Sequence, residues 1–211
     1  MIEYVKIETV FNRAEDGSKK LIEGNFRNET VQYLQNNYWE WTEKIDGTNI
    51  SVVWDGHKVQ FHGRTERAQI PAHLVNKLNE LFGGETNEQI FEQVFGETPM
   101  ILFGEGYGPK IQKGGSYRED VSFILFDVYQ PEGRIWLRRD SVEDIAEKFG
   151  IDVVPIVLHG DIDDAVKYVK GKPDSKFGTA KMEGLVGRPE VEMRDRLGRR
   201  VIVKVKVRDF E

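Results

Sequence analysis

The chain has 211 residues, enough for one substantial core and too few for two ordinary domains. Hydrophobic residues make up 39% of the chain and charged residues 31%, the profile of a soluble globular protein and not of a disordered or membrane protein. The sequence contains no cysteine, which excludes disulfide bonds, thiolate metal sites and a cysteine nucleophile. The absence of cysteine also leads us to expect a cytoplasmic protein. No apolar run approaches the roughly 18 residues of a membrane-spanning helix, so we expect no membrane partner.

The net charge of −6 argues against a protein whose main task is to coat nucleic acid. The charge is unevenly placed, because residues 188–208 contain eight basic and three acidic side chains. A basic segment on an acidic chain favours a specific phosphate site over a nonspecific polyanion surface. Solvated charges on a turn and a strand would explain the same pattern.

In chain order, residues 28–37 predict a short helix, and residues 50–64 predict a β-hairpin that turns at Asp55 and Gly56. Residues 71–84 predict a helix that follows a proline and ends at two glycines, and residues 87–96 predict another. Residues 100–108 and 121–129 are apolar runs of strand length.

In the last third of the chain, Ser141 and Asp144 resemble a capping box that opens a helix closed by Gly150. Residues 163–171 predict a short helix, and residues 198–210 an alternating strand. The elements follow one another without a regular βαβ rhythm. We therefore predict an α+β fold, with largely antiparallel sheets flanked by helices, in one domain that covers residues 1–211.

Two stretches of the sequence contain lysines at positions that suit phosphate chemistry. Residues 41–56 read WTEKIDGTNISVVWDG, so Lys44 lies just before a glycine and a strand. In the last strand, valines occupy one face, and Lys204 and Lys206 share the other. Two cations about 7 Å apart on a strand suit one phosphate, although a solvated basic strand face would look the same.

Other candidate residues stand at strand ends. Glu105 in FGEG and Glu183 in MEGL each precede a glycine, and a hard cation such as Mg²⁺ prefers carboxylate oxygen. Phe126 in FDV has a ring that could stack on a base, and Arg64 follows the hairpin. Each of these residues has an ordinary structural explanation when taken singly.

Their order along the chain resembles a known family. Lys-x-Asp-Gly, Gly-Arg-Thr, Phe-Gly-Glu-Gly, Phe-Asp-Val, Glu-Gly-Leu-Val and Lys-x-Lys follow one another from Lys44 to Lys206. This series is similar to the covalent nucleotidyltransferase superfamily of polynucleotide ligases and capping enzymes. Within it the chain most resembles the ATP-dependent RNA ligases of the second phage type, which include the RNA-editing ligases. The resemblance covers about residues 41–207 and implies the adenylation-domain, ATP-grasp-like fold.

The resemblance implies that the Lys44 amine attacks the α-phosphorus of ATP and forms a lysine–AMP phosphoramidate. An ordinary lysine amine is protonated at neutral pH. Nearby positive charge and partial burial both favour the neutral form. Lys204, Lys206 and a bound Mg²⁺ (or Mn²⁺) would supply that charge and neutralise the α-phosphate.

The resemblance also implies the partners and the remaining contacts. AMP passes to a 5′-phosphate end, and a 3′-hydroxyl end then seals the strand, with RNA as the preferred nucleic acid. Glu105 would bind the ribose, Phe126 would stack on adenine, and Glu183 would hold the metal. The other nucleotide contacts implied are the Glu43 backbone, Ile45, Asn49 and Arg64.

Three questions stay open at this point. A DNA nick ligase or a GTP-using capping enzyme carries similar motifs, and a binding module could keep the fold without the activity. The RNA ligases usually have a further C-terminal domain, whereas this sequence stops five residues after Lys206. We therefore expect an adenylation domain without that accessory domain, and whether a partner subunit replaces it is left open.

Overall fold

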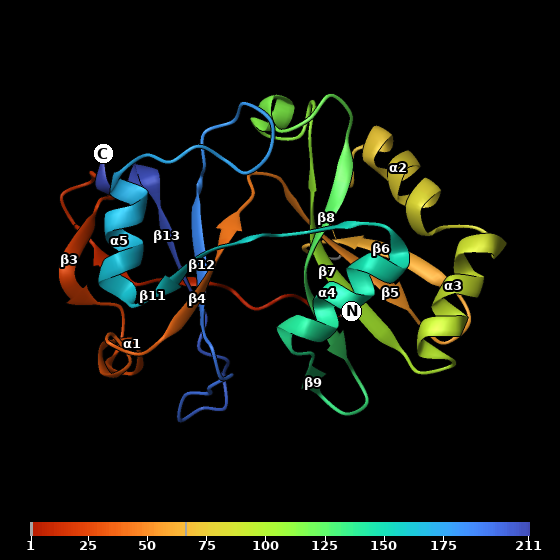
Figure 1. Ribbon diagram of the computed structural model, residues 1–211, viewed down its shortest axis with the longest axis horizontal. Helices are drawn as coiled ribbons and strands as arrows, with labels where there is room; N and C mark the ends of the chain where they lie inside the picture. Colours follow the sequence, from red (N-terminus) through yellow and green to blue (C-terminus); the bar gives the residue numbers. More distant parts are fainter. Residues whose placement is uncertain (1, 66) are drawn as a thin grey trace. The chain divides into compact units, whose positions relative to one another are not determined.

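The computed structural model describes residues 2–65 and 67–211, which form two compact units (Figure 1). Unit 1 consists of residues 46–154 together with residues 2–4, and unit 2 of residues 5–45 and 155–211. Within the described residues, no helix combines the length and the apolar character needed to cross a bilayer.

Unit 1 contains a sheet with the strand order β10-β8-β7-β5-β6, and β9 pairs with β8. Its strands are β5 (Thr48–Trp54), β6 (Val59–Gly63), β7 (Met100–Tyr107), β8 (Ser122–Gln130), β9 (Ile135–Trp136) and β10 (Asp152–Val153). The predicted hairpin is confirmed as β5 and β6. Asp55 Oδ1 accepts the N–H groups of His57 and Lys58 in its turn, and Gly56 has a φ of +101°, which favours glycine.

Three helices pack with this sheet: α2 (Ala72–Phe82), α3 (Glu85–Phe95) and α4 (Arg139–Phe149). Apolar side chains of all three helices join the strands in one core, in which Phe82, Phe91 and Phe149 contact one another through their rings. All three helices were predicted, and α4 ends before Gly150 as expected. The predicted capping box at Ser141 is wrong, because α4 begins two residues earlier and its N-cap residue Arg138 makes no side-chain capping bond.

Unit 2 contains a sheet with the strand order β1-β13-β12-β4-β11 and a small sheet of β2 and β3. Its elements are β1 (Glu8–Thr9), β2 (Phe11–Arg13), β3 (Leu21–Phe26), α1 (Glu29–Tyr33), β4 (Trp39–Lys44), β11 (Ile156–Gly160), α5 (Ile162–Lys170), β12 (Gly184–Pro189) and β13 (Val203–Lys206). Helix α5 packs against the face of this sheet that carries Trp39, Trp41 and Leu185 (Figure 1).

The last strand is shorter than predicted. Strand β13 ends at Lys206, and Val207–Phe210 form a 3₁₀ turn, η2, in which Asp209 accepts the backbone N–H of Lys206. The pairings in both main sheets are mostly antiparallel, whereas β1–β13 and β10–β8 are parallel. The predicted α+β class with largely antiparallel sheets and flanking helices is confirmed.

Candidate active site

Lys44 is the last residue of β4, and its position is set by the register of three strands in unit 2. Gly184 of β12 lies opposite Lys44 on one side and opposite Lys206 of β13 on the other. A Cβ atom on Gly184 would lie 2.2 Å from the Val205 carbonyl oxygen, so only glycine permits this close approach. Directly paired residues share a sheet face. The pairing therefore brings two lysines that are far apart in the sequence to one face.

The Glu183 carboxylate joins these two lysines. Its Oε2 atom lies 2.7 Å from Lys44 Nζ, and its Oε1 atom lies 2.5 Å from Lys206 Nζ. All three side chains are less than a quarter exposed, at 23% for Lys44, 16% for Glu183 and 11% for Lys206. Burial by itself raises the pKa of Glu183, but the ammonium groups of Lys44 and Lys206 outweigh burial and hold this pKa below its usual value. Glu183 is therefore ionised at neutral pH.

Lys204 lies on the same face of the sheet, two residues before Lys206 on β13. It pairs with Val186, just as Lys206 pairs with Gly184. Burial lowers the pKa of Lys204, and the positive charges of Lys206 and Lys44 lower it further. The lysine cluster, which we define as Lys44, Lys204, Lys206 and Glu183, thus has an excess of positive charge in a partly buried setting, as an anion site requires.

Asp209, which we did not single out in the sequence, holds Lys206 in place. Asp209 is buried, and its carboxylate accepts the Lys206 backbone N–H at 3.1 Å and Arg13 Nη1 at 2.9 Å. Val207, the residue after Lys206, donates its backbone N–H to the Glu183 carbonyl. The end of β13 is therefore held by side-chain and backbone bonds, which limits the positions that Lys206 can take. In the sequence, the only signal for this capping bond is an acidic residue, Asp209, three positions after Lys206.

Glu43 points to the opposite face of β4, where it is 1% exposed. Its carboxylate accepts Ser175 Oγ at 2.5 Å and the Lys176 backbone N–H at 2.9 Å, and its own backbone N–H donates to the Pro155 carbonyl. Burial raises the pKa of Glu43, and the two accepted hydrogen bonds offset only part of that effect. The Glu43 side chain thus anchors the loop before β12. The next residue, Ile45, is buried.

This arrangement predicts a pH-dependent effect of Glu43→Gln. A carboxyl group whose pKa is raised by folding stabilises the folded state while protonated, and this contribution falls as pH rises through the folded pKa. Glutamine stays neutral, so the variant should gain stability relative to the natural chain between pH 5 and pH 8. Glu43→Ala should cost about 1–3 kcal/mol because it leaves buried donors without a partner. Urea unfolding at the two pH values measures both effects, and a pH-independent difference for Glu43→Gln would contradict the assignment.

In unit 1, Asn49 of β5 lies directly opposite Glu105 of β7, so the two polar side chains share one face. Arg64 directly follows Gly63, the last residue of β6, which pairs with Ile50. Asn49 Oδ1 is buried and has no hydrogen-bond partner among the described residues. A buried acceptor without a donor is costly in a folded protein, and a ligand that donates a hydrogen bond would relieve that cost.

Phe126 occupies a β-bulge. Phe103 pairs with Asp127 and Gly104 pairs with Leu125, so β8 has one residue more than β7 at this point. A bulge redirects the side chain of the extra residue. The Phe126 ring meets the edge of Tyr4, and Tyr4 Oη donates to the buried Asp127. A prediction based only on the alternation of side chains along β8 would therefore have assigned the Phe126 ring to the wrong face of the sheet.

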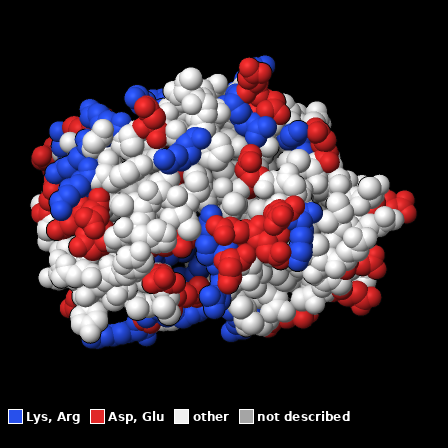
Figure 2. Space-filling model, viewed as in Figure 1, with Lys and Arg blue, Asp and Glu red and all other residues white. Residues whose placement is uncertain are grey.

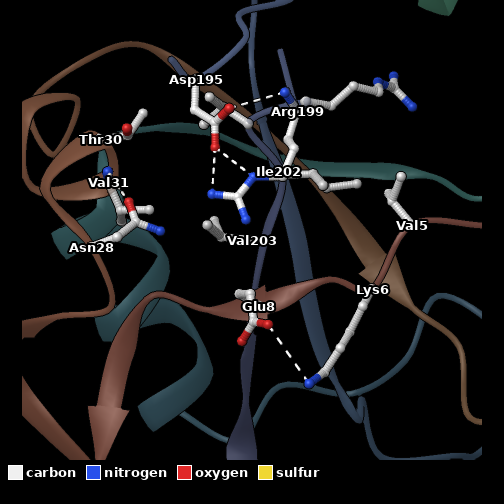
Figure 3. Close-up of a pocket in the computed structure, with 12 residues that line it drawn as sticks. Val5, Lys6, Glu8, Asn28, Thr30, Val31, Asp195, Arg199, Ile202 and Val203 are labelled. Atoms are coloured by element: carbon white, nitrogen blue, oxygen red, sulfur yellow. Dashed lines mark hydrogen bonds and ion pairs between the residues drawn. The ribbon is translucent and has the colours of Figure 1, made fainter. Parts of the chain in front are cut away.

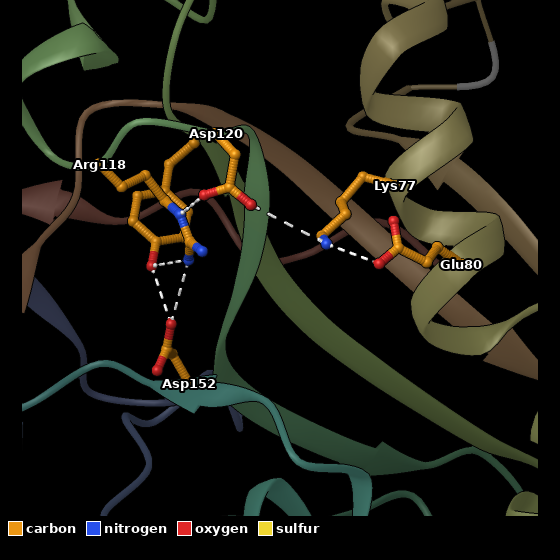
Figure 4. A network of polar contacts seen from close by, with 6 residues as sticks. Lys77, Glu80, Arg118, Asp120 and Asp152 are labelled. Carbon is orange, nitrogen blue, oxygen red and sulfur yellow. Dashed lines mark hydrogen bonds and ion pairs between the residues drawn. The ribbon is translucent and has the colours of Figure 1, made fainter.

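A polar network fixes the segment that follows Glu105 (Figure 4). Arg118 donates to Tyr107 Oη at 3.1 Å, and Tyr107 Oη donates to Asp152 at 3.0 Å. Burial raises the pKa of Tyr107 to about 12, so the hydroxyl remains a donor at neutral pH. Farther along the same segment, Tyr117 Oη accepts the Asp46 backbone N–H at 3.1 Å. Residues 107–118 are thus tied to the sheet and to the start of unit 1.

The rest of the surface offers weaker candidates. Basic and acidic side chains are intermingled on the face in Figure 2. Unit 2 has a cavity of about 350 Å³, in which Lys6 pairs with Glu8 and Arg199 pairs with Asp195 (Figure 3). Because these four side chains form ion pairs with one another, we assign no substrate to this cavity. Within the described residues, no group of three or more histidine or acidic side chains is placed to hold a metal ion.

Comparison with known proteins agrees with this geometry. The RNA ligase family model matches residues 37–206. An alanine variant of the Naegleria gruberi RNA ligase with ATP and Mn aligns at a TM-score of 0.68 and 18% identity, over 97% of this chain and 56% of that chain. A second variant of this ligase with ATP and Mn aligns at 0.63 and 18%, over 84% and 52%.

At this identity the structural likeness shows the fold, and the chain spans about half the length of those ligases. No curated protein matches it. The family match extends from before Lys44 to Lys206, so it includes the whole lysine cluster and the cross-strand row of Asn49 and Glu105. The chain belongs to the RNA ligase family.

Proposed function

We propose that this chain is an ATP-dependent RNA ligase that acts through a covalent lysine–AMP intermediate. The observation that supports it best is the lysine cluster, in which a half-buried lysine ends a strand beside two further lysines and one ionised carboxylate. The bound ATP in the related Naegleria structures supports ATP as the AMP donor. A protein that only bound nucleic acid would not need a nucleophile at the centre of this cluster.

The reaction proceeds in three steps. The unprotonated amine of Lys44 attacks the α-phosphorus of ATP, the bond to the β-phosphate oxygen breaks, and pyrophosphate leaves. A 5′-phosphate oxygen of the polynucleotide then attacks the same phosphorus and displaces Lys44, which gives an adenylylated end. A 3′-hydroxyl attacks the phosphorus of that end, AMP leaves, and the phosphodiester bond is complete.

Lys204 and Lys206 stabilise the negative charge that develops on the transferring phosphoryl group. Their side chains are held by strand β13, so little reorganisation accompanies the reaction. Glu183 holds Lys44 and Lys206 together before ATP arrives. In unit 1 we assign the ribose to Glu105, adenine to Phe126 and a phosphate to Arg64.

The remaining assignments complete the nucleotide contacts. The unpartnered Asn49 Oδ1 suits a donor on the nucleotide or the substrate. Glu43 and Ile45 contribute through their backbone, because the Glu43 side chain is occupied by Ser175 and Lys176. We treat residues 1–211 as one adenylation domain, and a cytoplasmic location stays a prediction.

A divalent cation fits the donor chemistry of Glu183. Mg²⁺ commonly binds one or two carboxylates and completes its coordination with substrate phosphates and waters. Glu183 offers a single ionised carboxylate, and no all-protein cage is found among the described residues. When bound, such a cation neutralises phosphate charge. The Mn in the related Naegleria structures supports the same class of ion.

Labelled nucleotides test the proposed function directly. Incubation with α-labelled ATP and Mg²⁺ should give a covalent, acid-labile AMP adduct, and GTP should not. An adduct from GTP alone would indicate a capping-type enzyme, and no adduct from either would indicate a binding module. Sealing of matched RNA and DNA substrates with 5′-phosphate and 3′-hydroxyl ends then decides between an RNA ligase and a DNA nick ligase.

Replacing Glu183 tests its two roles. Glu183→Ala should lower the rate of adduct formation at least about tenfold, as loss of a group that tunes a metal site does, whereas Glu183→Asp should retain part of the activity. The natural carboxylate, whose pKa is lowered, stabilises the fold above its unfolded pKa, and this contribution is lost as pH falls through the folded pKa. Glu183→Gln should therefore lose stability at pH 7, and this loss should become smaller as the pH falls below the unfolded pKa of the carboxylate. A wild-type rate in folded Glu183→Ala would remove this residue from the site.

A further inference from the structure

A stacked aromatic pair lies at the end of β4 that is opposite to Lys44. The rings of Tyr38 and His159 are 5.6 Å apart between centroids and 14° from parallel. Tyr38 is 52% exposed, and His159 is exposed as well. The Tyr38 carbonyl accepts the Glu190 N–H, which continues the β4–β12 ladder by one residue. The pair is thus a firmly placed ring surface that remains open to solvent.

The register places this pair on the same sheet face as the lysine cluster. His159 of β11 lies opposite Glu40 of β4, and Glu40 lies opposite Arg188 of β12. Paired residues share a face, and residues two apart along a strand share a face. Glu40 and Lys44 are four residues apart on β4, so the row of His159, Glu40 and Arg188 belongs to the Lys44 face.

Between the two ends, this face carries the cations Lys204 and Arg188 and the anion Glu40. Lys204 pairs with Val186, which pairs with Thr42, midway between the Lys44 row and the Glu40 row. Thr42 is buried and forms the floor of this middle row. Lys44 is six positions along the chain from Tyr38, which corresponds to about 20 Å along a strand. A stacked nucleic-acid strand covers that distance in about six nucleotides.

Cations on the same face as an exposed ring suit the binding of a single nucleic-acid strand, because phosphates contact the cations and bases stack on aromatic faces. ATP cannot supply the occupant, since only the ribose separates its α-phosphate from the adenine. We propose that the Tyr38–His159 pair is a stacking platform for a base of the polynucleotide strand whose reacting end lies at Lys44. This inference rests on the proposed ligase function and deepens it by assigning a surface to the substrate.

Binding of short RNAs tests the platform without requiring turnover. The probes are 5′-phosphorylated RNAs of ten and of two nucleotides, labelled at the 3′ end and measured by fluorescence anisotropy at one salt concentration. Tyr38→Ala should weaken binding of the ten-nucleotide RNA about 5- to 150-fold, the range expected for one lost stacking contact. Tyr38→Phe keeps the ring and should bind as the natural chain does. The two-nucleotide RNA is too short to reach the platform, so its affinity should not change.

Tyr33→Ala is the matched control, because Tyr33 is 88% exposed on α1 and lies outside the sheet face. It should leave RNA binding unchanged. Adduct formation from ATP involves no polynucleotide and should proceed normally in all three variants, which separates failure of the platform from failure of the proposed function. Natural affinity of Tyr38→Ala for the ten-nucleotide RNA, equal losses in Tyr33→Ala, or no RNA binding by the natural chain would each overturn the platform.

Discussion

Lys44→Ala is expected to form no covalent AMP adduct, because the variant lacks the amine that attacks ATP in the proposed reaction. Lys44→Arg should fail as well, since a guanidinium stays protonated and cannot attack phosphorus. Loss of the nucleophile is the largest effect expected of any substitution in this chain. Intact-mass spectrometry after incubation with ATP and Mg²⁺ measures it, and a normal adduct in Lys44→Ala would refute the central proposal.

A second substrate separates loss of the nucleophile from loss of the fold. A strand supplied with its 5′ end already adenylylated does not require attack by Lys44. The Lys44→Ala variant should therefore still seal such a strand, provided that Glu183 and Lys206 keep their positions. Circular dichroism provides the folding control. Lys44→Ala removes one of the two cations that hold the pKa of Glu183 below its usual value, so the same variant should show a raised Glu183 pKa.

Lys206→Ala and Lys204→Ala should each slow adduct formation on the order of 10²–10³-fold, the usual cost of losing one fixed charge-stabilising donor. The developing charge on the phosphoryl group is less well stabilised once one of these fixed cations is lost. The rate of AMP adduct formation measures the loss, with circular dichroism as the folding control.

Lys181→Ala is the matched control for these two variants. Lys181 is an exposed lysine of unit 2 whose ammonium group pairs with Asp174 and not with Glu183. Its loss should change stability by less than about 0.5 kcal/mol and leave the rate unchanged. The buried valines of β13 are untouched in the Lys204 and Lys206 variants, so these should fold. Natural rates in both folded variants would mean that their spacing reflects only a solvated strand.

The fold class and the candidate residues could be predicted from the sequence because the signals are local. Alternation of apolar residues specifies which side chains share a strand face, and Val203 and Val205 are buried while Lys204 and Lys206 lie on the other face. Turn and helix-ending residues mark the hairpin of β5 and β6 and the end of α2. The ordered series of short motifs identified the RNA ligase family, which the family match confirms.

Some local signals misled the prediction of element ends. Ser141 stands in a capping-box pattern, yet α4 begins earlier and Asp140 accepts the Ser141 N–H instead. The alternation after Val203 continues to Val207, but the strand stops where Asp209 caps the Lys206 N–H and turns the chain. In both cases hydrogen bonds from neighbouring side chains outweighed the periodic pattern.

By itself, the sequence determined the elements, their buried faces and the residue types available for phosphate chemistry. Only the tertiary structure decided which of them meet. Lys44 and Glu183 are 139 residues apart, and their contact depends on a strand register that Gly184 permits. The bulge at Phe126, the buried Glu43 carboxylate and the Asp209 bond likewise depend on partners distant in the chain or on strand pairing. Periodicity reports the environment of one strand, whereas register and pairing arise from long-range packing, which no local pattern encodes.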